Sequence, residues 1–443
     1  MKNEIIIQKK DTLKIFLIGQ TTLHWGRMEF GNIGNYYVIE PFIRELHNTF
    51  KNCEITTTLQ MSKRFCKEEK VNVVPMELYY GWKNDLEKAK KELKIAEKYF
   101  KTGKLEETTP YIEQVLKSDL IIDFSGDIWG DNADFLGDDR FLVGLYKNRI
   151  VQLLKKKNVM LAGSPGPFNN KKNLEFARKV FADFDLVTNR ESLSREILIR
   201  NNFNISKLYD LSCPSFLFES NKKINIYDII QNKSEIDTSK PIAGFIISGW
   251  NFSKGPYNKW PRADTDYITF AETVEFMDSL GMNIVLISHS NGFIPNKKPF
   301  KLIHGRDFPI IEQLYKVIKD RKIAKNIILL DGIFDAWETK AIIGSLDMLV
   351  SGRLHGAVAG LSQFIPTVII DYGHEPKAHK LKGFAIEVDV ENFVADPNNK
   401  SDLIMKIEKC YNNREKYAEH LRKKIPEVKK KAKMNFELLK NLI

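Results

Sequence analysis

Short apolar runs alternate with longer helical segments along nearly the whole chain, and this alternation constrains the fold more than any other feature. The runs at 13–19, 120–124 and 242–248 are almost wholly apolar. Strands buried on both faces of a sheet have this appearance, and parallel strands require a crossover segment between them. The alternation therefore predicts an α/β fold of parallel sheets covered by helices on both faces.

A chain of 443 residues is longer than one hydrophobic core usually organises, so we expect two Rossmann-like domains facing a central cleft. The segment 219–240 is rich in Lys and Asn and loses its apolar period in its second half, which is typical of a domain connection. We predict α/β domains at 1–218 and 241–400, a linker at 219–240, and basic C-terminal helices at 401–443.

The chain carries 68 Lys and Arg against 57 Asp and Glu, a formal net charge of +11. Nucleic acid, anionic lipid and phosphorylated metabolites are all acidic partners that suit this charge, and of these we do not predict nucleic acid. Part of the excess lies in the C-terminal segment 401–443. That segment is either a solvated helix closing the fold or a peripheral contact with an anionic membrane surface.

The four Cys residues are scattered without CxxC spacing, so neither a zinc site nor a disulfide framework is indicated. No HExxH or EF-hand motif occurs, and we predict no metal. The N-terminal sequence MKNEIIIQKKDTLK has an apolar run too short for a signal sequence or a spanning helix. We expect a cytoplasmic location, with the inner membrane face as the place of any peripheral contact.

The stretch 346–380 holds the densest group of chemically useful side chains. It begins with an apolar strand, turns at Ser351, and continues into a small-residue helix, with Arg353 and His355 at the junction. A helix start offers unpaired N–H groups and a partial positive charge. An Arg and a His at such a start indicate an anion pocket beside a titratable group whose ordinary pKa is near neutrality.

Other polar residues also follow predicted strands. Because ligands bind at the carboxyl ends of parallel strands, we expect these residues to share one cleft. For Asp127, a plain helix-capping turn is an equally good interpretation. The residues placed in this way are Asn32, Asn35, Asp127, Arg190, His289, Tyr372 and Lys377.

The order of these pieces resembles the polysaccharide pyruvyl transferase family, whose signature is a strand, Ser-x-Arg-Leu-His, a small-residue helix, a second strand after Pro, and a Tyr followed by a Lys. A second match lies at Arg190, Glu191 and Ser194, which resemble the family's Arg-Asp/Glu-x-x-Ser segment. Asn35 stands where the family carries an Asp. The residues that match the signature are Ser351, Arg353, Leu354, His355, Pro366, Tyr372 and Lys377.

The resemblance implies a GT-B-like transferase that moves a pyruvyl group from phosphoenolpyruvate to sugar hydroxyls as a ketal, with no cofactor. The acceptor would be a glycan or lipid-linked saccharide, bound on the N-terminal side, as in exopolysaccharide or cell-envelope biosynthesis. His355 would act as the acid or activate the hydroxyl. Arg353 and Lys377 would hold the carboxylate and phosphate of the donor, and Arg190 would reach in from the N-terminal domain.

Two other functions fit the same sequence. Glu375 could grip ribose hydroxyls, as in a GT-B glycosyltransferase that uses a nucleotide sugar. A non-catalytic glycan-binding protein would need only the aromatic residues of the loop 249–264, which include Trp250 and Trp260. Such residues either stack on sugar rings or pack in the protein interior.

Overall fold

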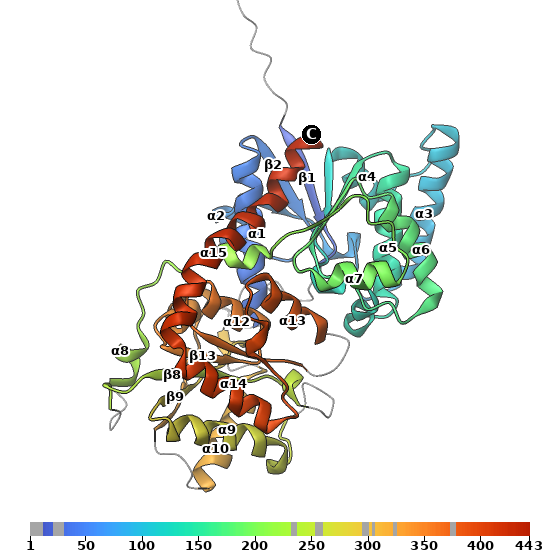
Figure 1. The fold of residues 1–443 in the computed structure, drawn as a ribbon. Helices are drawn as coiled ribbons and strands as arrows, with labels where there is room; N and C mark the ends of the chain where they lie inside the picture. Colours follow the sequence, from blue (N-terminus) through green and yellow to red (C-terminus); the bar gives the residue numbers. More distant parts are fainter. Residues whose placement is uncertain are drawn as a thin grey trace, which may run out of the picture.

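The computed structural model contains two large parallel sheets, each flanked by helices (Figure 1). Strand order in the first sheet is β3-β2-β1-β4-β5-β6-β7, and in the second it is β12-β9-β8-β13-β14-β15. This arrangement confirms the predicted α/β class. The structure describes residues 12–20, 31–231, 237–252, 260–294, 301–303, 306–321, 326–372 and 378–443.

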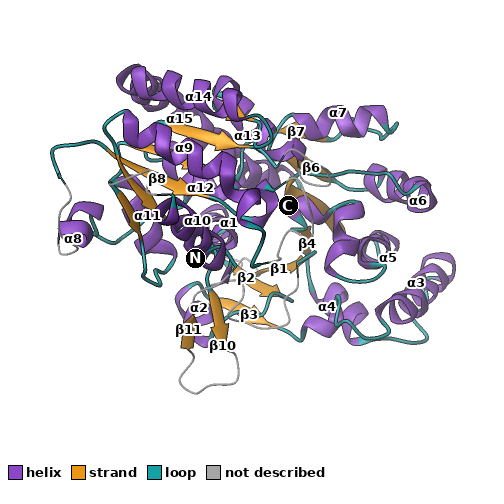
Figure 2. Cartoon of the chain, turned by 90° about the horizontal axis from the view of Figure 1, so that it is seen from below, coloured by secondary structure: helices purple, strands orange, loops and turns teal. Residues whose placement is uncertain are grey.

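The first sheet and its helices are built from residues on the N-terminal side of the chain. The strands are β1 (Leu13–Ile18), β2 (Cys53–Thr57), β3 (Val71–Val73), β4 (Leu120–Asp123), β5 (Lys157–Gly163), β6 (Leu186–Asn189) and β7 (Leu208–Asp210). The helices are α1 (Ile33–Thr49), α2 (Lys63–Glu68), α3 (Asp85–Thr102), α4 (Pro110–Lys117), α5 (Arg140–Leu153), α6 (Lys171–Ala182) and α7 (Leu193–Arg200). The outermost of these helices, α3, α5, α6 and α7, line one side of the molecule in Figure 2.

The second sheet follows the short helix α8 (Ile226–Gln231). Its strands are β8 (Ile242–Ile246), β9 (Asn283–Leu286), β12 (Ile327–Leu329), β13 (Met348–Ser351), β14 (Thr367–Ile370) and β15 (Val394–Ala395). Its helices are α9 (Ile268–Ser279), α10 (Phe308–Asp320), α11 (Ala336–Gly344), α12 (Leu354–Leu361) and α13 (Ala378–Glu387). A separate antiparallel hairpin, β10 (Gly292–Ile294) and β11 (Lys301–Ile303), pairs with neither sheet (Figure 2).

The strand order of each sheet contains one point of reversal, where ligands commonly bind in this class of fold. The order reverses between β1 and β4 in the first sheet and between β8 and β13 in the second. In open α/β sheets, the loops that leave the strands at such a reversal diverge and open a crevice. The residues that follow these four strands are therefore the first place to look for a site.

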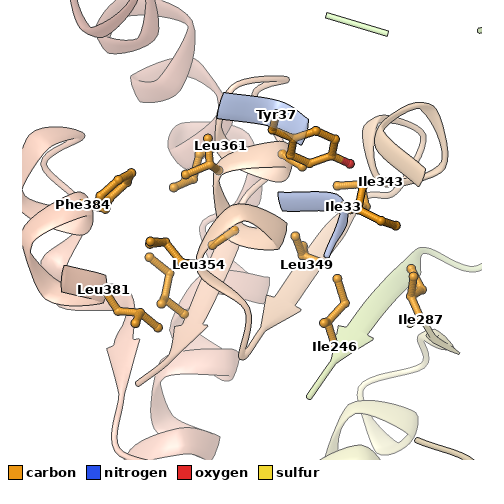
Figure 3. Close-up of a cluster of buried hydrophobic side chains, with 14 of the residues drawn as sticks. Ile33, Tyr37, Ile246, Ile287, Ile343, Leu349, Leu354, Leu361, Leu381 and Phe384 are labelled. Atoms are coloured by element: carbon orange, nitrogen blue, oxygen red, sulfur yellow. The ribbon is translucent and has the colours of Figure 1, made fainter. Parts of the chain in front are cut away.

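Helix α1 joins the two domains through apolar contacts. Ile33 and Tyr37 of α1 lie among second-domain side chains that include Leu354 of α12 and Leu349 of β13 (Figure 3). Both α1 residues are buried, with at most 1% of their surface exposed. Burial of a side chain of this size stabilises a fold by roughly 1.5–3 kcal/mol. These contacts hold the start of α1 against the start of α12.

The two C-terminal helices are α14 (Lys400–Asn412) and α15 (Arg414–Glu437), and α15 runs from the second domain back to the first (Figure 1). Near its end, Asn435 donates to the Ser212 carbonyl at 2.9 Å, and the Phe436 ring lies 5.1 Å from that of Phe42. The sequence predicted basic C-terminal helices that close the fold, and α15 closes it by packing on the first domain. Within the described ranges, no helix combines the length and apolar character needed to cross a bilayer. A contact of α15 with a membrane surface stays a prediction.

The predicted linker is partly structured. The last strand of the first sheet ends at Asp210 and the first strand of the second begins at Ile242. Between them, α8 places Ile226 and Ile230 in the hydrophobic core with 0% exposure. The short strand β15 and the β10–β11 hairpin were not predicted.

Candidate active site

Loops from both sheets meet where their strands end. In the second domain, His289 follows β9, Arg353 follows β13 and Tyr372 follows β14. In the first domain, Asp127 lies in the turn η3 (Gly126–Ile128) after β4, and Arg190 follows β6. The expectation that strand ends bring these residues to one cleft is supported by contacts between the domains.

Asp127 pairs with two cations, of which Lys380 belongs to the second domain and Arg190 to its own. Its carboxylate accepts a hydrogen bond from Lys380 Nζ on α13, and its Oδ1 lies 3.9 Å from Arg190 Nη2. Arg190 is buried, donates from Nε to Ser164 Oγ at 2.8 Å, and lies over the ring of Phe384 at 5.6 Å. Asp127 is thus an ion-pair partner in addition to being part of a turn. Lys380 was not among the predicted site residues.

Arg353 is held by a buried carboxylate that sequence reasoning missed. Asp307, which is 0% exposed, accepts from Arg353 Nε at 3.0 Å and also from Nη2. Asp307 stands at the N-cap of α10, a place where an Asp usually accepts from its own helix. Its side chain makes no capping bond there. The sequence signal therefore indicated a local cap, whereas the structure uses the residue to orient Arg353.

His355 lies at the start of α12, where α1 of the first domain packs against the second domain. A Cβ built on Gly34 of α1 would lie 2.6 Å from His355 Cβ and 2.7 Å from Nδ1. Only a glycine therefore fits at position 34 without displacing the imidazole. Among the residues that the structure describes, His355 Nε2 is shielded from solvent and has no hydrogen-bond partner.

The pKa of His355 departs from the near-neutral value expected from the sequence. Burial is the main cause that lowers this pKa well below its ordinary value, and the positive charges of Arg190 and Lys380 lower it further. Desolvation and nearby cations both disfavour the imidazolium ion. His355 is therefore a neutral imidazole at physiological pH.

Two further His residues share this environment. Burial, followed by the charge of Arg353, lowers the pKa of His289 to about 3. Burial and the neighbouring Lys380 lower the pKa of His379 to about 4. His289 Nε2 and both ring nitrogens of His379 have no hydrogen-bond partner within the described ranges. Sequence reasoning did not select His379, which lies at the start of α13 and outside the signature.

The remaining predicted residues have structural contacts. Ser351 Oγ donates to the Arg353 carbonyl at 2.9 Å and accepts from the Arg353 N–H, so it shapes the turn. Asn32 forms an isolated bridge with Ser290 of the second domain, and its Nδ2 lies 3.5 Å from Asn35 Oδ1.

Tyr372 is 5% exposed, and its ring centroid lies 6.0 Å from that of Trp250. Lys377 and Glu375 lie outside the described residues. No group of three or more His, Cys, Asp or Glu side chains suitable for a metal occurs in the part of the chain that the structure describes.

Comparison with solved structures supports the fold. A glycosyltransferase from Rickettsia africae covers 97% of this chain and 100% of its own, at 12% identity and a TM-score of 0.56. The Anabaena protein Alr3699/HepE, solved with UDP and glucose, covers 98% and 99% at 13% identity and a TM-score of 0.55. The similarity to these structures confirms the GT-B-like arrangement of two Rossmann-like domains.

Sequence comparison identifies the family. The amylovoran biosynthesis protein AmsJ of Erwinia amylovora is 22% identical over 383 residues, which cover 82% of this chain and 84% of AmsJ. The family model for polysaccharide pyruvyl transferases matches residues 32–374, a range that contains Asn32, Asp127, Arg190, Arg353 and His355. With most of its length matched, including these residues of the interdomain cluster, the chain belongs to the polysaccharide pyruvyl transferase family of transferases.

Proposed function

We propose that this protein transfers a pyruvyl group from phosphoenolpyruvate to two hydroxyls of a glycan or lipid-linked saccharide, forming a cyclic ketal. The observation that carries the proposal is that Arg190 and Lys380 lie near His355, whose Nε2 has no hydrogen-bond partner among the described residues, while Arg353 lies near the neighbouring His289. Phosphoenolpyruvate carries a carboxylate and a phosphate. Arg binds such groups through two N–H donors and Lys acts as a mobile point charge.

Donor binding would change the protonation of His355. Asp127 is the counter-ion of Lys380 and lies near Arg190. The phosphate and carboxylate of the donor would add negative charge beside the imidazole and offset the two cations. An added anion favours the charged form of a His. His355 would therefore gain a proton together with the donor and become a general acid only in the complex.

The reaction balances with the groups available. The His355 imidazolium donates its proton to the methylene carbon of the donor, and a sugar hydroxyl adds to C2. The C2–O bond to phosphate then breaks, and a second hydroxyl closes the ketal. The two hydroxyls release two protons, of which one replaces the proton given by His355 and the other leaves with phosphate. Proton transfer by a placed side chain typically contributes 10²–10⁴-fold to a rate.

The proposal is tested by incubating the protein with phosphoenolpyruvate and candidate glycans and measuring the mass of an added pyruvyl ketal. The wild type should give this product, and His355→Ala should lose it by about 10²-fold or more while keeping its circular dichroism spectrum. His420→Ala, on α15 and outside the cluster, serves as the matched control. Thermal stabilisation by a nucleotide sugar alone would instead favour the glycosyltransferase interpretation.

A further inference from the structure

We infer that the exposed ring of Phe135, backed by the buried rings of Trp250 and Tyr372, forms an aromatic subsite that binds one pyranose ring of the acceptor beside the His355 cluster. The inference deepens the proposed function and rests on it for the identity of the ligand as an acceptor. The three rings form a continuous series from the molecular surface to the cluster. The first comes from the N-terminal domain and the other two from the C-terminal domain.

Phe135 is an unusual surface residue. It lies in η4 (Asp131–Leu136), the turn that follows Asp127, and 57% of its surface is exposed. An exposed aromatic ring loses the favourable burial of its apolar area, and such residues mark binding sites when they extend a larger apolar surface. The ring of Phe135 packs against the buried ring of Trp250, with the two centroids 5.7 Å apart at an angle of 61°, and leaves its own outer face exposed.

The backbone that carries Phe135 is firmly held. Trp82 Nε1 donates to the carbonyl of Leu136 at 2.9 Å, next to Phe135. At the other end of η4, the Asp131 carboxylate accepts the backbone N–H groups of Asn169 and Asn170. The exposure of Phe135 is therefore fixed by the fold, and the ring is pre-organised for a ligand.

Trp250 and Tyr372 connect Phe135 to the charged cluster. Trp250 lies in η6 (Gly249–Asn251) after β8, and its ring centroid is 6.0 Å from that of Tyr372. Tyr372 follows β14, and its hydroxyl is close enough to Arg353 and Asp127 for their charges to influence its pKa, which burial raises to about 12. A sugar that covers Phe135 would lie beside the turn η3, which carries Asp127.

The chemistry of this surface suits a sugar better than a purely apolar ligand. A pyranose presents C–H groups on one face and hydroxyls around its edge. The exposed ring of Phe135 matches the C–H face, while Asp127 offers an acceptor for hydroxyl protons on the side of the cluster. The subsite would place an acceptor hydroxyl toward the donor position, which the proposed transfer requires.

Saturation-transfer difference NMR with the methyl glycosides of glucose, galactose and mannose tests the subsite without the donor. The wild type should bind at least one glycoside, with saturation strongest at the C–H groups of one ring face. Phe135→Ala should weaken that binding by about threefold to tenfold, and Phe135→Tyr, which keeps the ring, should restore it. Phe100→Ala is the matched control, since Phe100 is 52% exposed on α3 and contacts none of these rings.

Equal binding by Phe135→Ala and the wild type would overturn the subsite, and so would the absence of binding of all three glycosides to the wild type. This readout is separate from the ketal assay. A protein that binds the glycosides through Phe135 but forms no ketal would refute the proposed function and leave the sugar subsite standing. A protein that forms the ketal equally well with and without the Phe135 ring would refute the subsite alone.

Discussion

Lowering the pH from about 8 to about 5 should destabilise this protein through the His residues at the domain junction. His289, His355 and His379 all have depressed pKa values in the folded state. A depressed pKa means that the unfolded chain takes up a proton that the folded chain does not. The stabilisation is therefore fully present above about pH 6.5, the ordinary pKa of His, and is lost as the pH falls below it.

The magnitude follows from the unfolded state. Protonation of a His with a pKa of about 6.5 stabilises the unfolded state by about 1.36 kcal/mol for each pH unit below that value. At pH 5 this stabilisation is about 2 kcal/mol. The folded pKa values of His289 and His379, about 3 and about 4, lie below pH 5, so the folded state gains almost nothing. Between about pH 8 and about pH 5, these two residues together should lower the free energy of unfolding by about 4 kcal/mol. This is a large part of the roughly 5–15 kcal/mol that stabilises a typical domain.

The assay is urea unfolding at about pH 8, 6.5 and 5, followed by circular dichroism, for the wild type and His379→Gln. The variant lacks one titrating group, so its free energy of unfolding should fall by about 2 kcal/mol less than that of the wild type over this range. His420→Gln, on α15, is the control and should follow the wild type. Parallel curves for the wild type and His379→Gln would refute the argument that His379 is held neutral by burial.

Two further variants test the geometry of the cluster. Asp307→Asn removes the carboxylate of a buried ion pair, so the free energy of unfolding in urea should fall by about 3–5 kcal/mol and the KM for phosphoenolpyruvate should rise; an unchanged KM would show that Arg353 does not contact the donor. Gly34→Ala places a methyl group 2.6 Å from His355 Cβ. The substitution should lower the free energy of unfolding measured in urea by about 1–3 kcal/mol and reduce kcat for ketal formation. An unchanged kcat would contradict the proposed position of His355 in the reaction.

Much of the fold was predictable because its signals are local. The strands at 120–124 and 242–248 are apolar enough to be recognised without a partner, and β4 and β8 lie within those limits. The strand β15 and the helix α8 were missed, since β15 consists only of Val394–Ala395 and α8 lies in a polar segment. Both depend on packing against distant parts of the chain.

The site was predictable in part for the same reason. Arg190, Arg353 and His355 directly follow apolar strands, so their place at the carboxyl edge of a sheet can be inferred from the order of elements alone. Asp307 and Lys380 occupy helix starts with no motif around them. Their importance comes from partners far away in the sequence, which a local pattern does not reveal.

The sequence by itself determined the fold class, the family signature and the type of chemical group at each strand end. The tertiary structure decided which charges meet and which protonation states result. Asp307 pairs with Arg353, Asp127 pairs with Lys380 across the domains, and burial keeps His355 neutral. The physical reason is that residue type is written in the chain, whereas desolvation and Coulomb energy depend on distances that only the packed domains establish.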